Sequence, residues 1–187
     1  MFVKAIASLS CLVSTVLGHG AVTSYTVDGK NYPGMRCNGG KSAPLTASIQ
    51  AGSNITANWK QWTHAQGPVM VWIGEKQGWF KIDQMGLWGN NLNSENWGTA
   101  IVLKQLKWSS KIPRNLKPGN YLIRHELLAL HQAHTPQFYA ECAQIVVEGS
   151  GTAQPPSSVL KSIPGYAPQN DPGITVSGTC ATFFFDV

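Results

Sequence analysis

The segment KPGNYLIRHELLAL, residues 117–130, decides the fold class of this chain. It opens with a Lys-Pro-Gly-Asn sequence typical of a turn, and aromatic and branched apolar residues then alternate with polar ones. In a strand, Ile123, His125 and Leu127 lie on one face, so the alternation favours burial of His125 with its apolar neighbours. The segment is therefore predicted to form a half-buried β-strand over Asn120–Leu130.

Short segments of the same kind recur along the chain, and turn sequences rich in Gly, Pro, Asp and Asn separate them. No segment shows the sustained 3.6-residue periodicity and capping residues that predict a helix. From Gly149 onward Pro, Ser and Gly predominate, which predicts long loops. We therefore expect an all-β fold, an antiparallel immunoglobulin- or fibronectin-like β-sandwich with long loops, with a barrel as the alternative. The further predicted strands are Ala21–Val27, Asn54–Trp62, Val69–Ile73, Ala100–Trp108 and Ala143–Val147.

The first eighteen residues, MFVKAIASLSCLVSTVLG, contain one cation, Lys4, followed by an uncharged run from Ala5 to Leu17. This layout predicts a secretory signal peptide over 1–18, and the run is too short for a membrane span. An uncleaved anchor or a buried first strand is the alternative. We expect a secreted, extracellular protein that starts at His19, with a single domain over 19–187 and no membrane partner.

Charge and acidic residues argue against two classes of function. The chain has 14 Lys and Arg against 9 Asp and Glu, a net charge of +5, without the basic runs of a nucleic-acid binder. A glycoside hydrolase needs two positioned carboxylates, and no pair of acidic residues is marked by a motif, so hydrolysis is a minor alternative. Asn54-Ile55-Thr56 is a sequon, which predicts glycosylation of Asn54 in a secreted protein.

Cleavage before His19 places a free amino group and an imidazole on one residue. The amino group, with an ordinary pKa of about 7.7–8.0, can lose its proton and bind a metal, and Nδ1 of the same residue closes a chelate ring. One more imidazole completes three nitrogens, a donor set that favours Cu(II). His64, on a loop just before Gly67-Pro68, is a candidate for that imidazole. His125-Glu126 does not belong to a helical HExxH zinc motif, because the next histidine, His131, follows too late.

At these residues the chain resembles the fungal lytic polysaccharide monooxygenases of auxiliary activity family 9, formerly glycoside hydrolase family 61. The resemblance runs from His19 to about Ile174. It implies a copper enzyme that oxidatively cleaves cellulose or related β-glucans at C1 and/or C4. Such an enzyme uses O2 or H2O2 as co-substrate and an external reductant or redox partner as electron donor, and we expect it to act as a monomer on a glucan surface. The segments that carry the resemblance are HGAVTSYTVDGKNYPG, GPVMVW, GWFKIDQMGLW, IPRNLKPGNYLIRHELLALHQA, QFYAECAQIVVEGSG and PGYAPQNDPGI.

The resemblance also implies roles for single residues. His19 and His64 would supply the copper nitrogens, and Tyr139 would be the axial ligand. Gln137 and His131 would form the catalytic pair that hydrogen-bonds the oxygen species beside the metal. In a strand, Gln137 and Tyr139 point to one face, which agrees with this assignment.

Four further residues receive roles from the same resemblance. Cys37 and Cys142 match the family's long-range disulfide. Tyr25 and Tyr166 are candidates for stacking on sugar rings, with packing inside the fold as the alternative for each.

The chain also departs from the family pattern. The loop between the opening strand and Cys37 is short, and His64 stands four residues before Pro68, where three is commoner. The chain ends in ITVSGTCATFFFDV, with an odd Cys180, where relatives continue with a tyrosine-bearing strand. From about residue 175 the sequence is therefore atypical, as in a truncated chain. The alternative function is a non-catalytic relative that binds copper or glucan without turnover.

Overall fold

The computed structural model describes residues 20–33, 45–75, 78–132, 134–168, 170–171 and 173–174. The predictions for the signal peptide, His19, Cys37 and Cys180 fall outside these residues. In the described part, no helix is of a length and hydropathy that would let it cross a membrane.

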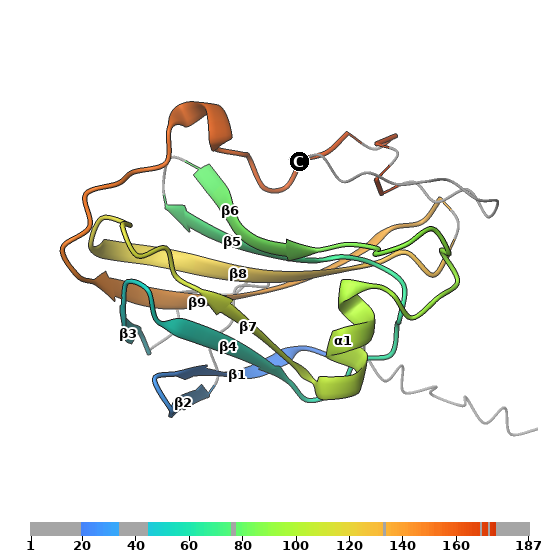
Figure 1. Cartoon of the computed structure of the whole chain (residues 1–187), viewed down its shortest axis with the longest axis horizontal. Helices are drawn as coiled ribbons and strands as arrows, with labels where there is room; N and C mark the ends of the chain where they lie inside the picture. Colours follow the sequence, from blue (N-terminus) through green and yellow to red (C-terminus); the bar gives the residue numbers. More distant parts are fainter. Residues whose placement is uncertain are drawn as a thin grey trace, which may run out of the picture.

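Two β-sheets pack face to face (Figure 1), which confirms the predicted sandwich. One pair of strands departs from the antiparallel prediction, because β3 and β9 pair in parallel. The four-stranded sheet has the order β2-β1-β4-β7, with β1 (Val22–Val27), β2 (Lys30–Pro33), β4 (Asn54–Trp59) and β7 (Lys107–Lys111). The five-stranded sheet has the order β3-β9-β8-β5-β6, with β3 (Ala47–Gln50), β5 (Val69–Glu75), β6 (Gly78–Met85), β8 (Gly119–Ala129) and β9 (Gln137–Glu148).

The main core lies between the two sheets and follows the alternation seen in the sequence. Ile123 and Leu127 on β8 are fully buried there, together with Ile55 of β4 and Val71 of β5. Each such side chain contributes about 1.5–3 kcal/mol on burial. His125 is also fully buried, as predicted, and its ring lies 5.4 Å from that of Tyr25 between the sheets.

The segment Ala100–Trp108 was predicted to be a strand, and this is wrong. It forms α1 (Gly98–Gln105) and then enters β7. The β-branched Ile101 and Val102 favour a strand locally, but Val102 packs into the core as part of a helix, so tertiary packing overrides propensity. Leu106 ends the helix in the left-handed region, φ 53°, and its N–H bonds to the carbonyl of Val102.

A second apolar cluster covers the outer face of the five-stranded sheet. Met70 and Trp72 of β5 and Leu128 of β8 pack there against Trp97 and Ile174. The chain that follows β9 crosses this face (Figure 1). It is loop, as predicted, and in the described part only the short helix η1 (Ser157–Val159) and isolated bridges interrupt it. The sheet therefore separates an inner core from an outer layer, and the two candidate tyrosines of the sequence lie on different sides of it.

Candidate metal centre

Two histidines that are far apart in sequence lie in contact beyond one end of the sandwich. The rings of His64 and His131 are parallel within 6°, with their centroids 3.8 Å apart. The backbone explains this approach, because β5 pairs with β8 and the pairing continues into the segment before β5. There Leu128 N–H donates to the carbonyl of Pro68, and Leu130 N–H donates to the carbonyl of Gln66. The loop that carries His64 is thereby held against the end of β8.

Tyr139 brings a phenol to the same place from β9. Its ring centroid lies 6.4 Å from that of His64. Gln137 shares its face of the strand, and the Tyr139 hydroxyl donates a hydrogen bond of 2.6 Å to Gln137 Oε1. The structure thus brings together four of the predicted site residues, His64, His131, Gln137 and Tyr139.

Trp62 closes the predicted strand Asn54–Trp62 but lies beyond β4, which ends at Trp59, and it supports this site. Its side chain is buried, and its ring stands edge-on to His64 at 5.4 Å and to Tyr139 at 5.1 Å. Its Nε1–H donates to the backbone carbonyl of His64 at 2.5 Å. Only its position two residues before His64 hinted at this contact.

The electrostatics of the site keep the phenol protonated. Burial raises the pKa of Tyr139 above its ordinary value, so the hydroxyl remains a hydrogen-bond donor to Gln137 at neutral pH. His131 is exposed and His64 is half-buried, so the site opens to solvent on the side of His131.

The donor types present fit copper. His64 offers an imidazole nitrogen and Tyr139 a phenol oxygen, and these are not the thiolate or carboxylate sets that suit other common ions. Within the described ranges, no group of three or more His, Cys, Asp and Glu residues could hold a metal. A copper site with three nitrogen donors would therefore need a donor from outside these ranges, and the predicted ligand His19 lies there.

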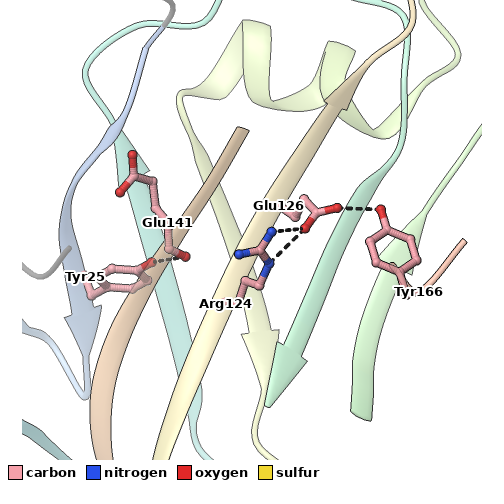
Figure 2. A network of polar contacts seen from close by, with 5 residues as sticks. All are labelled: Tyr25, Arg124, Glu126, Glu141 and Tyr166. Atoms are coloured by element: carbon pink, nitrogen blue, oxygen red, sulfur yellow. Dashed lines mark hydrogen bonds and ion pairs between the residues drawn. The ribbon is translucent and has the colours of Figure 1, made fainter. Parts of the chain in front are cut away.

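The two tyrosines proposed for sugar stacking have different surroundings (Figure 2). Tyr25 is fully buried, and its hydroxyl donates to the backbone carbonyl of Glu141 at 3.2 Å. A ring with no exposed surface cannot stack on a sugar, so the substrate-binding prediction for Tyr25 is corrected: it is a core residue. Burial, and secondly the charge of Glu141, raise its pKa.

Tyr166 lies on the outer face of the sheet, where the structure does not bring it to the histidines. Its hydroxyl donates to Oε1 of the fully buried Glu126 at 2.5 Å, and Arg124 bonds the other oxygen of that carboxylate (Figure 2). Burial, followed by the charge of Glu126, raises the pKa of Tyr166. Phe138 contacts the Tyr166 ring, while its neighbour Tyr139 points to the opposite face.

Two other predicted sites are described in part. Cys142 is disulfide-bonded, and its predicted partner Cys37 lies outside the described residues. Asn54 is exposed at the start of β4, so its side chain is accessible.

Comparison with known proteins identifies the family. The sequence profile of Auxiliary Activity family 9 (formerly GH61) matches residues 22–182. The chain is similar to AA9 family lytic polysaccharide monooxygenase D of Thermothelomyces thermophilus, with 44% identity over 220 aligned positions that cover 92% of this chain and 86% of the relative. Because that alignment is longer than the 187-residue chain, the relative has residues at positions where this chain has none.

Solved structures agree with this match. The crystal structure of a cellulose-active polysaccharide monooxygenase from M. thermophila superposes with a TM-score of 0.77 at 44% identity, covering 84% of this chain and 90% of that one. Cel61B from Hypocrea jecorina, a glycoside hydrolase family 61 member, gives a TM-score of 0.76 at 27% identity, covering 89% and 96%. The chain therefore belongs to Auxiliary Activity family 9, the family of the lytic polysaccharide monooxygenases.

Proposed function

We propose that this protein is a secreted, copper-dependent monooxygenase that cleaves cellulose or a related β-glucan oxidatively, at C1 and/or C4. The observation that carries the proposal is the convergence of His64, His131 and Tyr139 from three segments at one end of the sandwich. A similar protein of known structure is described as cellulose-active, which supports the choice of substrate.

In this proposal, His19 follows a signal peptide over 1–18 and begins a single domain over 19–187. Its amino group and imidazole, with the imidazole of His64, would hold copper, and the phenol of Tyr139 would supply an oxygen donor beside them. Bound copper supplies one-electron redox chemistry, with electrons from an external donor and O2 or H2O2 as the oxidant.

The other residues of the site orient groups and hold protons. The Tyr139 hydroxyl donates a hydrogen bond to Gln137 Oε1, and this bond fixes the orientation of the phenol in the site. His131 is exposed beside His64, where an imidazole can donate a hydrogen bond or a proton to an oxygen species. Trp62 holds the backbone at His64 and packs edge-on against both donor rings.

The disulfide is proposed to join Cys37 to Cys142, three residues beyond Tyr139. It closes a loop of roughly 105 residues, which contributes about 4–5 kcal/mol in the chain-entropy model. The bridge would brace β9, the strand that carries Tyr139. An open site held by a rigid sandwich suits the surface of an insoluble glucan, on which the enzyme acts as a monomer with an external reductant.

The decisive experiment is a copper titration by calorimetry on secreted protein whose first residue is His19. The matched control carries one extra glycine before His19. We expect tight binding of one ion that the added glycine abolishes, followed by oxidised oligosaccharides from cellulose with ascorbate. Equal binding in both forms overturns the copper assignment. Tight binding without any oxidised product means a non-catalytic relative that binds copper only.

A further inference from the structure

A cavity of about 590 Å³ lies on the outer face of the five-stranded sheet, the face opposite to Tyr139, and His134 is among its lining residues. It is formed by β8, by the turn before β9 and the first residues of β9, and by the loop around Tyr166 and Ile174. Its volume falls within the range of about 300–1,000 Å³ that is usual for small-molecule sites. Nothing in the proposed copper chemistry uses this cavity.

The cavity has aromatic and apolar walls. Phe138 and Tyr166 meet there edge to face, with 79° between their planes and 6.2 Å between their centroids. Phe138 keeps 47% of its surface exposed, although it is a large apolar side chain. Ile163 and Pro164 line the cavity beside them. Two perpendicular rings form a corner that can receive a third ring, stacked on one and edge-on to the other.

One cationic side chain also lines the cavity. Arg124 directs Nε and Nη2 to the same carboxylate oxygen of Glu126, at 2.8 and 2.6 Å. The Nη1 nitrogen is turned away from Glu126 (Figure 2), and in the described part of the chain Arg124 has no other hydrogen-bond acceptor. The Nη1–Nη2 edge of the guanidinium therefore retains two parallel N–H donors, the geometry that binds a carboxylate in two places.

The carboxylate of Glu126 is fully buried, and both of its oxygens already accept hydrogen bonds, Oε1 from Tyr166 and Oε2 from Arg124. The remaining N–H groups of Arg124 are therefore available to a carboxylate that enters the cavity.

We propose that this cavity binds a small aromatic carboxylate. The ring would lie in the corner of Phe138 and Tyr166, and the carboxylate would take the Nη1–Nη2 edge of Arg124. A sugar is a poorer fit, because its hydroxyl groups need many polar partners and the walls here are mostly apolar. This site goes beyond the proposed function, since it does not involve His64, Tyr139 or copper.

The test is a titration of the full, metal-free protein with benzoate, followed by amide NMR. Benzamide keeps the ring without the charge, and acetate keeps the charge without the ring. We expect benzoate to bind about tenfold more tightly than either, as for one charge-assisted bidentate contact or one aromatic contact. The shifts should centre on Phe138 and Tyr166 and spare His64.

Two variants sharpen the test. Phe138→Ala removes a half-exposed ring and should weaken benzoate about tenfold, the scale of one aromatic contact. Arg124→Lys keeps a cation for Glu126 but loses the two parallel N–H donors, and it should reduce the preference for benzoate over benzamide. The matched control is Trp88→Ala, another exposed aromatic ring, 45% exposed, and it should change nothing. Equal binding of benzoate and benzamide, or unchanged binding in Phe138→Ala, overturns the proposal, whatever the outcome of the copper titration.

Discussion

The imidazole of His64 stacks on that of His131 at 3.8 Å, with only 6° between the planes. One ring comes from the loop before β5 and the other from the end of β8, so the stack joins two neighbouring strands at the rim of the sandwich. The half-buried His64 is a proposed metal ligand, and the exposed His131 is a proposed proton or hydrogen-bond donor. Substitutions can therefore separate the two roles.

His131→Phe keeps a ring to stack on His64 and removes both ring nitrogens. We expect copper affinity to stay within a few-fold of the parent, while the rate of oxidised product formation falls about 100-fold, the lower end of general acid–base effects. Calorimetry and product analysis by mass spectrometry measure the two quantities. His64→Ala is the matched variant and should lose copper binding itself. A His131→Phe enzyme with full activity would show that the second imidazole only packs.

Trp62→Phe tests whether the indole N–H positions the metal centre. The variant keeps an aromatic ring between His64 and Tyr139 but loses the hydrogen bond to the His64 carbonyl. The loss of one such bond is worth about 0.5–1.5 kcal/mol, which corresponds to a copper affinity lowered about 2- to 10-fold. The Cu(II) EPR spectrum should change as His64 shifts. Trp88→Phe, at an exposed tryptophan, is the control and should leave both measurements unaltered. An unchanged spectrum in Trp62→Phe would contradict a positioning role.

The strands of the large sheet could be predicted from the sequence because they alternate regularly. Along β8 every second side chain from Tyr121 to Ala129 faces the core, and this placed His125 correctly. The alternation failed on β1, where the pairing register shifts between Val22 and Ser24. Such a bulge resets the side-chain phase, so that Tyr25 turns inward.

The site itself depended on contacts that no local pattern contains. The stack of His64 on His131 requires the pairing of Pro68 with Leu128, which joins segments 60 residues apart. The helix α1 was missed for a related reason, since its helical state depends on burial against both cores rather than on the β-branched residues it contains. The nitrogen donors His19 and His64 could be proposed from the chemistry of the chain, and the roles of Tyr139, Gln137 and His131 only from the family resemblance. Only the folded chain shows which of the described residues meet.

Tyr166→Phe should destabilise the fold without affecting the metal centre. The change leaves Oε1 of the buried Glu126 without its hydrogen-bond donor. An unsatisfied buried polar group costs about 1–3 kcal/mol, and the free energy of unfolding in urea should fall by that amount. Tyr32→Phe, at a partly buried ring on the edge strand β2, is the control: it keeps the packed ring, removes only the hydroxyl group and should cost less than about 0.5 kcal/mol. Copper affinity should be equal in the parent and in both variants, because Tyr166 lies on the opposite face of the sheet from Tyr139. A weakened copper site in Tyr166→Phe would mean that the outer layer is coupled to the metal centre.

Stability should fall as the pH is lowered from about 6.5 toward 3, because of His125. Burial lowers the pKa of this imidazole from 6.5 to about 3, and neither ring nitrogen has a hydrogen-bond partner in the described part of the chain. Between these two values the unfolded chain binds a proton that the folded chain excludes, so each pH unit removes up to about 1.4 kcal/mol from the free energy of unfolding. Above pH 6.5 both states are neutral at this residue and the effect vanishes.

Urea unfolding at pH 7, 5.5 and 4 measures this dependence, and His125→Leu should flatten it, since the substituted side chain cannot titrate and is similar in size to the ring it replaces. Trp88→Leu, at an exposed residue that does not titrate, is the control and should keep the parent's slope. If His125→Leu loses stability with falling pH as steeply as the parent, the acid sensitivity comes from the carboxylates, and the buried imidazole is already protonated or hydrated in the folded protein.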